Sequence, residues 1–376
     1  MYKTRSRAQI YCPVLEEVFK IRTPAIVSPQ GCISLLRAIY IQYVLLPEVF
    51  QMNILAVDDD PIILDLIRTT VQPLREITVT TSSSSLEAWD LLSAGAAHFD
   101  CLLLDIEMPD IDGITLCRQI RSLPDHLDTP ILMLTRRTDA LSVGHAFVAG
   151  ATDYVTKPFE LGDLKSRLRV ADRMVKRSDA VPQIPARALQ KIGLPGVHLF
   201  NEDQPLHIKD VPQLIGPFSL GAYLSQLSRS SLDDCHIFAA TIDTFPQLYA
   251  DGSTAELGTA IVATTKIIAR SLDCPQLLMA HQGRGILLCV MTTAQPPNWE
   301  AVEEAIQREI TQMDLRFGHK GKIAFSLSVG KPIQPYASPT QRVKKTFDRA
   351  IARVTGPQKQ SFVASEPKLR SAAFAQ

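Results

Sequence analysis

The chain has 376 residues, of which 46% are hydrophobic and 21% charged, a composition typical of a soluble globular protein with room for two domains. Its 39 Lys and Arg residues balance 39 Asp and Glu residues, so the formal net charge is zero. That balance argues against a polyelectrolyte partner such as bulk nucleic acid, although it is compatible with a local basic patch. The seven cysteines are scattered and form no CxxC pair, which predicts free thiols in a reducing cytoplasm and no zinc site.

Residues 1–51 form an N-terminal extension with two possible interpretations. Its apolar run over 32–46 is interrupted by Arg37 and Gln42 and is stopped by Pro47. This run is shorter than the ~20 apolar residues of a membrane-spanning helix, and it shows no small-residue cleavage site of a signal peptide. We expect either a docking helix or a natural chain that starts at Met52, and in both cases no membrane partner.

From Met52 to residue 176, short apolar strands alternate with amphipathic helices. The predicted strands cover 53–57, 77–80, 100–104, 130–134 and 152–155, and the predicted helices include 63–67, 86–92, 114–120, 140–148 and 161–175. Five strands that alternate with five helices predict a doubly wound (βα)5 parallel sheet of the α/β class, covered on both faces.

The remainder of the chain divides by composition. Residues 177–213 are rich in Pro and polar residues, which predicts a linker with one short helix near 186–192. Residues 214–355 mix strands over 236–242, 285–291 and 323–329 with helices over 254–272, 299–313 and 342–354, which predicts a second α/β domain. Residues 356–376 are predicted to be a disordered tail.

Polar side chains lie at the carboxyl ends of the predicted strands, where the sites of parallel sheets gather. They are Asp58, Asp59, Asp105, Thr135 and Lys157. Carboxylate oxygens are the ligands that Mg²⁺ prefers. The metal ion and a lysine would neutralise an incoming phosphoryl group, and a threonine hydroxyl could donate a hydrogen bond to it. A single Asp–Lys pair would be an ordinary salt bridge, whereas the whole set predicts a phosphorylatable carboxylate.

Residues 52–176 resemble the receiver domain of response regulators over its whole length. The resemblance rests on four stretches in receiver order, which are 54–61 (ILAVDDDP), 103–113 (LLDIEMPDIDG), 130–135 (PILMLT) and 150–159 (GATDYVTKPF). Each stretch alone is moderately specific, and all four at receiver spacing are strongly specific.

The resemblance implies a phosphoacceptor and a metal site. Asp105 would accept phosphate from a histidine kinase or a phosphotransfer protein. Asp58 and Asp59 would be the acidic pair that holds Mg²⁺ together with Asp105, and the backbone carbonyl of Glu107 would be a further ligand.

The resemblance also implies the residues that respond to phosphorylation. Thr135 and Lys157 would contact the phosphoryl group and switch position, and Tyr154 would be the aromatic switch residue. The bond between Lys157 and Pro158 is expected to be cis, as a tight turn would require.

One departure from the family lies next to the switch threonine. The following residue is usually small, whereas here it is Arg136, and Arg137 follows. A long cationic side chain could restrict access to the site or place a positive charge beside the phosphate, which would change phosphorylation or hydrolysis rates. Asp60 and Asp112 are expected to be helix caps or loop residues and not ligands.

Residues 214–355 resemble a GGDEF domain, the fold that condenses two GTP molecules into cyclic di-GMP. The resemblance rests on segment order: 214–219 (LIGPFS) resembles the family's LTGLxN turn, and 237–245 (IFAATIDTF) resembles its metal-binding strand. The stretch 280–287 (AHQGRGIL) takes the place of the signature hairpin, 326–330 (SLSVG) matches the SxSxG strand, and 348–351 (DRAI) matches the final helix.

The residues that perform cyclase chemistry are replaced. In the signature hairpin, Arg284, Gly285 and Ile286 stand where the family has its second Gly, Asp and Glu. Thr241 stands at the first metal-binding Asp position, and Pro246 stands at the phosphate-binding Lys position. Transfer between nucleotides needs carboxylates that hold two metal ions, so these replacements predict that the activity is lost.

Two features of this region leave a weaker alternative open. Asp243 remains, but one carboxylate is not a two-metal site. Gly283 and Gly285 could let the backbone approach a nucleotide phosphate with Arg284 nearby, or they could be turn glycines kept for backbone reasons, which is the interpretation we favour.

Together these patterns predict a cytoplasmic response regulator, not an enzyme, whose output is binding to a downstream protein, with homodimerisation possible. The first alternative is a phosphorylation-controlled diguanylate cyclase. The second is a DNA-binding transcriptional regulator, although no helix-turn-helix or basic stripe is visible after the linker and no nucleic acid is expected as a partner.

Overall fold

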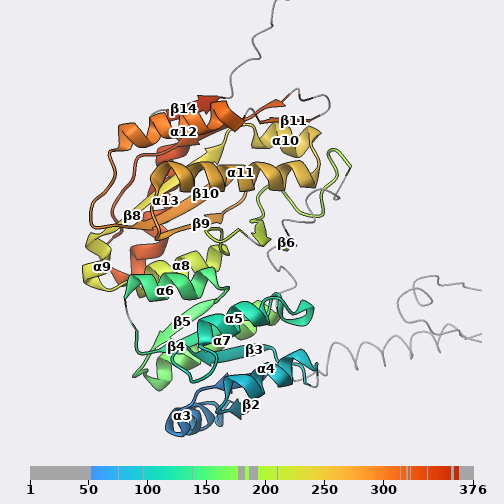
Figure 1. Ribbon diagram of the computed structural model, residues 1–376, viewed down its shortest axis with the longest axis vertical. Coiled ribbons are helices and arrows are strands. Elements are labelled where there is room, and N and C mark those ends of the chain that lie inside the picture. Colours follow the sequence, from blue (N-terminus) through green and yellow to red (C-terminus); the bar gives the residue numbers. More distant parts are fainter. Residues whose placement is uncertain are drawn as a thin grey trace, which may run out of the picture. The chain divides into compact units, whose positions relative to one another are not determined.

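Figure 1 shows the computed structural model, which describes residues 52–74, 76–95, 97–137, 139–176, 183–185, 194–209, 211–313, 315–318, 321, 323–336, 338–356 and 360–363. The described residues from Met52 onward form one compact unit. The N-terminal extension and the short helix expected near 186–192 lie outside the described residues. Within the described ranges, none of the helices combines the length and the apolar character needed to cross a membrane.

The first domain is built on a five-stranded parallel sheet. Its strands are β1 (Met52–Val57), β2 (Ile77–Ser82), β3 (Cys101–Asp105), β4 (Ile131–Thr135) and β5 (Asp153–Thr156), in the order β2-β1-β3-β4-β5. The predicted doubly wound parallel sheet is confirmed, and the strands lie close to their predicted bounds.

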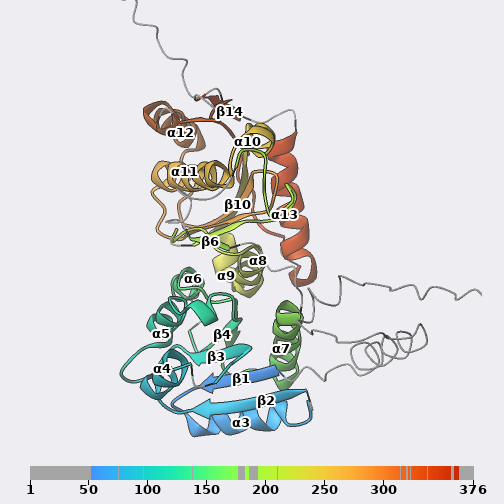
Figure 2. The same cartoon turned by 90° about the vertical axis from the view of Figure 1, so that its right-hand side faces the viewer.

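Helices cover both faces of this sheet because alternate strand residues point to opposite sides. Ile54 and Ala56 pack in the cluster that includes α3 (Pro61–Val71) and α7 (Leu161–Lys176). Leu55 and Val57 pack in the cluster on the other face, with α4 (Ser85–Ser93), α5 (Gly113–Ile120) and α6 (Ala140–Val148). Figure 2 shows α7 on one side of the strands and α4, α5 and α6 on the other.

Short polar side chains begin these helices by accepting backbone hydrogen bonds. The Asp60 carboxylate accepts from the N–H of Ile62, and the Asp112 carboxylate accepts from the N–H of Thr115. Both are therefore N-caps, as predicted. A 3-10 turn, η2 (Pro124–His126), follows α5.

The second domain has an antiparallel five-stranded sheet in the order β14-β13-β8-β10-β9. Its strands are β8 (Cys235–Ile242), β9 (Leu277–His281), β10 (Ile286–Thr292), β13 (Ser326–Val329) and β14 (Gln360–Val363). A short hairpin of β11 (Arg316–Phe317) and β12 (Ile323–Ala324) precedes β13.

Helices also cover both faces of the second sheet (Figure 2). The helices α11 (Thr254–Leu272) and α12 (Trp299–Met313) pack on one face, where their apolar side chains join Phe238 and Ala240 of β8. The helices α8 (Pro217–Gln226) and α13 (Pro339–Thr355) pack on the other face, with Ile237 and Ala239. Two short helices, α9 (Arg229–Asp233) and α10 (Phe245–Asp251), flank β8 in sequence.

The structure corrects both boundaries of the second domain. The predicted linker 177–213 is wrong at its end, because Leu206 and Ile208 are buried in the second core and β7 (His207–Lys209) pairs with β6 (Gln183–Pro185). The predicted tail is wrong at its start, because Gln360–Val363 is the strand β14. The buried side chain of Phe362 ties this segment to the core, which no compositional argument detects.

One helix of the second domain packs against the first domain. Leu220, Tyr223 and Leu224 of α8 belong to the same continuous cluster of buried side chains as Phe147 of α6 and Tyr154 of β5. The rings of Phe147 and Tyr223 meet edge to face, with their centroids 5.8 Å apart. The sequence predicts only a turn where α8 begins, so this helix was not predicted.

Candidate functional site

Three carboxylates converge at the carboxyl edge of the parallel sheet. Asp58 and Asp59 directly follow β1, and Asp105 is the last residue of the neighbouring β3. One oxygen from each carboxylate lies within 4.8 Å of the other two. Among the described residues, this is the group of three acidic, histidine or cysteine side chains that could hold a metal ion. Their hard oxygen donors fit Mg²⁺.

Lys157 places a positive charge against two of these acids. Its Nζ lies 2.6 Å from Asp58 Oδ2 and 3.1 Å from Asp105 Oδ1. The lysine side chain is 7% exposed, and the Asp58 side chain is fully buried. The peptide bond between Lys157 and Pro158 is cis, which confirms that prediction.

Burial works against the negative charge of Asp58. Desolvation raises the pKa of its carboxyl group above the ordinary value, and the hydrogen bond and charge of Lys157 oppose that rise. One lysine thus offsets only part of the cost of burying this acidic group. A divalent cation would stabilise the ionised carboxylates further, which is a second reason why the residues fit a metal ion.

A close backbone contact holds the turn after Asp105. The N–H of Gly113 donates to the Ile106 carbonyl over 3.0 Å. A Cβ at position 113 would lie 1.9 Å from the Asp105 carbonyl oxygen, so only glycine fits here. Gly113 therefore fixes the position of the backbone that carries the predicted phosphoacceptor.

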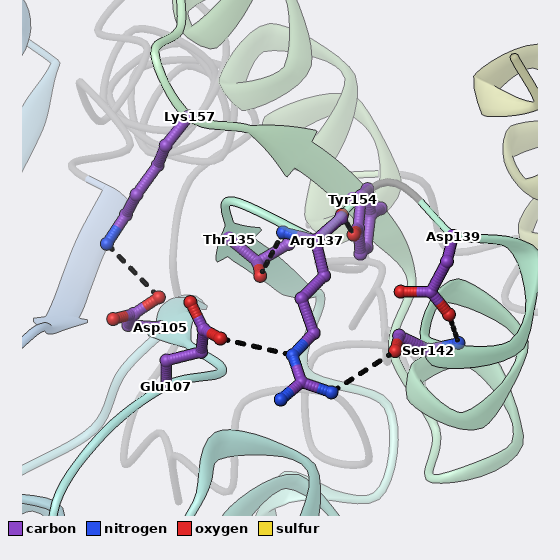
Figure 3. A network of polar contacts seen from close by, with 8 residues as sticks. All are labelled: Asp105, Glu107, Thr135, Arg137, Asp139, Ser142, Tyr154 and Lys157. Atoms are coloured by element: carbon purple, nitrogen blue, oxygen red, sulfur yellow. Dashed lines mark hydrogen bonds and ion pairs between the residues drawn. The ribbon is translucent and has the colours of Figure 1, made fainter.

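Thr135 and Tyr154 both form hydrogen bonds with the backbone of Arg137, in the loop that follows β4 (Figure 3). Thr135 is the last residue of β4, and its Oγ1 accepts a hydrogen bond of 3.1 Å from the N–H of Arg137. The buried Tyr154 donates its hydroxyl hydrogen to the Arg137 carbonyl. Burial raises the pKa of Tyr154, so its hydroxyl keeps the hydrogen that it donates.

The arginine that contacts Glu107 is Arg137, which was not predicted as a site residue. Its Nε lies 3.1 Å from Glu107 Oε1, and the Glu107 backbone is the expected further metal ligand. Arg136, which was predicted to modify access to the site, has an exposed side chain, as does Arg137. The sequence shows two adjacent arginines, and only the course of the loop decides which of them turns toward Glu107.

The positions predicted from the GGDEF resemblance lie near one end of β8 and the start of β10 in the second sheet. Thr241 pairs with Ile286 in the β8–β10 ladder, Asp243 follows β8, and Pro246 lies in α10. The Asp243 carboxylate accepts hydrogen bonds from Ser326 (3.2 Å) and Ser328 (2.7 Å). Two serine hydroxyls therefore donate hydrogen bonds to the Asp243 carboxylate.

The hairpin glycines have packing roles. Gly283, Arg284 and Gly285 all have positive φ angles, of 97°, 50° and 71°. A Cβ on Gly283 would lie 2.2 Å from the Asp203 carbonyl oxygen, and a Cβ on Gly285 would lie 2.6 Å from Phe245 Cβ. The Arg284 side chain pairs with Asp203 at the surface. These contacts favour the backbone interpretation of the glycines over nucleotide binding.

Comparisons with known proteins support the identification of the first domain as a receiver domain. A family model for the response regulator receiver domain matches residues 54–169. The chain is 37% identical over 133 residues to Response regulator MprA of Mycobacterium leprae, covering 35% of this chain and 56% of that protein. It is 38% identical over 128 residues to Response regulator MprA of Mycobacterium avium, covering 34% of this chain and 54% of that protein.

Among solved structures, the chemotaxis response regulator CheY4 of Vibrio cholerae is 31% identical, with 32% of this chain and 98% of that chain covered and a TM-score of 0.30. The chain spans about half the length of the curated relatives that it matches. Residues 54–169 of this chain therefore form a response regulator receiver domain.

Proposed function

We propose that this chain is a two-component response regulator in which Asp105 accepts a phosphoryl group from a histidine kinase or a phosphotransfer protein. The observation that carries the proposal is the position of the Asp105 carboxylate, which lies beside the Lys157 ammonium and within reach of two further acids. The Asp105 carboxylate is thus next to the positive charge of Lys157 and also next to the Asp58 and Asp59 oxygens, which could bind a cation.

The chain's own residues account for most of the proposed transfer. An Asp105 oxygen forms a bond to phosphorus while the bond from phosphorus to the donor nitrogen breaks, and the nitrogen leaves with its electron pair. Lys157 neutralises charge on the phosphoryl oxygens, and the Thr135 hydroxyl is placed at the same sheet edge to donate a hydrogen bond to them. A Mg²⁺ ion bound by Asp58, Asp59, Asp105 and the Glu107 carbonyl would supply further positive charge.

The proposal is tested by incubation with acetyl phosphate and Mg²⁺, followed by intact-mass measurement. The wild type is expected to gain one acid-labile phosphoryl group, and Asp105→Asn is expected to gain none. Asp110→Asn is a matched control in the same loop, because Asp110 is exposed and asparagine tolerates its positive φ of 64°. Phosphoryl uptake by Asp105→Asn would overturn the assignment.

The second domain is proposed to act by binding and not by catalysis, as a degenerate GGDEF-like output domain. Support comes from Asp243, whose carboxylate is bonded to serines, and from hairpin glycines that pack against neighbouring residues. Incubation of phosphorylated and unphosphorylated protein with GTP and Mg²⁺ or Mn²⁺ tests this view. Production of cyclic di-GMP would favour the rival reading as a diguanylate cyclase.

DNA binding is a second candidate because of the exposed face of α13. Lys344, Lys345 and Arg349 are exposed on this helix, together with the acidic Asp348. Lys345 Nζ and Arg349 Cζ lie 6.0 and 5.7 Å from the ring centroid of Tyr336. Salt-sensitive binding of duplex DNA that is lost in Lys344→Glu/Lys345→Glu, and retained in the α12 control Arg308→Glu, would support this candidate.

A further inference from the structure

We propose that Arg137 is a positioning residue that couples the state of Asp105 to the contact between α6 of the receiver and α8 of the second domain. The inference rests on the proposed phosphorylation of Asp105. It assigns a route for the signal that starts at the exposed Arg137–Glu107 ion pair and ends at the buried contact between the two domains.

The backbone of Arg137 joins two strands of the sheet. Its N–H donates to Thr135 Oγ1 over 3.1 Å, and its carbonyl accepts from the Tyr154 hydroxyl. Thr135 ends β4, and Tyr154 lies within β5. A displacement of either side chain therefore acts directly on the peptide groups of Arg137.

The side chain of Arg137 joins two further elements (Figure 3). Its Nε contacts Glu107 Oε1 at 3.1 Å, two residues after Asp105 in the chain. Its second contact is a longer one of 3.5 Å, from a terminal guanidinium nitrogen to Ser142 Oγ in the first turn of α6. Asp139 caps that turn by accepting from the N–H of Ser142 over 2.8 Å. The guanidinium thus spans the distance from the phosphoacceptor loop to the start of α6.

The helix α6 is in direct contact with the second domain. Its buried Phe147 packs edge to face against Tyr223 of α8. Tyr223 is itself held in place, because its hydroxyl lies 3.1 Å from Thr292 Oγ1 at the end of β10. Both rings are nearly fully buried, so a shift of α6 cannot be absorbed by solvent at this contact.

Phosphorylation would disturb this arrangement at Thr135. The hydroxyl would donate its hydrogen to a phosphoryl oxygen, and movement of Thr135 toward Asp105 would lengthen the 3.1 Å contact with the Arg137 N–H. Arg137 then follows Thr135 or leaves Glu107 and Ser142. Either response displaces the start of α6 and loosens the packing of Phe147 on Tyr223, which is a two-state change biased by one modification.

Arg136 offers a matched control for this role. Arg136 has the same charge and length as Arg137 and is likewise exposed, but it makes none of the ion pairs found in the described part of the chain. The replacements Arg137→Ala and Arg136→Ala therefore remove equal charge from adjacent positions. Only the first breaks the contacts with Glu107 and Ser142.

The test is hydrogen exchange of the α8 segment Pro217–Gln226 in the full chain, with and without beryllofluoride and Mg²⁺ as a stable phosphoryl mimic. In the wild type and in Arg136→Ala, exchange of α8 is expected to accelerate roughly 5-fold or more on addition of the mimic. In Arg137→Ala, the change is expected to fall below about 2-fold, while intact mass after acetyl phosphate treatment still shows phosphorylation. Arg137→Gln serves the same purpose if the alanine variant does not fold.

A charge exchange separates coupling from a merely structural role. In the double variant Glu107→Arg/Arg137→Glu, the ion pair is restored with reversed polarity, so part of the α8 response is expected to return. Absence of an α8 response in phosphorylated wild type, or a full response in Arg137→Ala, would overturn the inference. Absence of phosphorylation in the wild type would instead overturn the proposed function, so the two failures are distinguishable.

Discussion

The substitution Gly113→Ala tests how strictly the backbone positions the phosphoacceptor. The added Cβ would lie 1.9 Å from the Asp105 carbonyl oxygen and 2.8 Å from its carbonyl carbon, whereas ordinary van der Waals contact begins at 3.4 Å. The two backbone segments would therefore have to separate by about 1.5 Å, since neither is a flexible side chain. Overpacking of this kind costs about 1–3 kcal/mol of stability, and a misplacement near 1 Å slows reactions about 10²-fold.

Two measurements follow from this estimate, namely the free energy of unfolding in urea and the rate of phosphorylation by acetyl phosphate with Mg²⁺. We expect Gly113→Ala to lower both by the amounts given above. Gly144→Ala is the matched control, because Gly144 lies within α6 with nothing within 4 Å of its added Cβ. That control should stabilise the protein by about 0.5–1 kcal/mol. A Gly113→Ala protein as stable and as rapidly phosphorylated as the wild type would refute the reasoning.

Three further predictions concern single residues. Burial lowers the pKa of His281 to about 3, whereas its ordinary pKa in the unfolded chain is about 6.5, so between these pH values the unfolded state binds one more proton than the folded state. The free energy of unfolding should therefore decrease as the pH falls below about 6.5, by up to ~1.4 kcal/mol per pH unit. Urea unfolding of His281→Gln at several pH values should show a weaker dependence of this free energy on pH. Arg121→Met should cost about 3 kcal/mol or more in urea unfolding, because Arg121 donates to the carbonyls of His126, Thr129 and Gly150; an unchanged midpoint would contradict this. Lys157→Met should slow phosphorylation by acetyl phosphate about 10²-fold, and a rate close to that of the wild type would remove the lysine from the proposed chemistry.

The receiver site was predictable because its geometry follows from strand order. Once Asp58 and Asp105 end neighbouring parallel strands, their side chains must meet at one edge, and the sequence shows where each strand ends. The identity of the arginine at the site was not predictable in this way. Whether Arg136 or Arg137 reaches Glu107 depends on loop dihedral angles that leave no pattern in the sequence.

The second domain was harder to predict because its missed elements carry weak periodic signals. The helix α8 begins at Pro217 and contains Gly221, two residues that normally disrupt helices. Proline is tolerated here because it occupies the first turn, where its missing N–H has no intrahelical partner. The strand β14 is only Gln360–Val363, and its pairing with β13 is a long-range contact. Tertiary packing therefore decides both elements.

The burial of α8 changes how a signal from Asp105 could reach the second domain. A flexible linker alone would leave the two domains independent, and phosphorylation could then act only through surfaces of the receiver. Here, however, Tyr223 and Leu220 share one continuous buried cluster with Phe147 of the receiver, so a movement of α6 must change the packing of the second domain. Because this packing is dense and the second domain is proposed to act by binding, a change of interdomain contact is a more direct output than a change of catalytic rate.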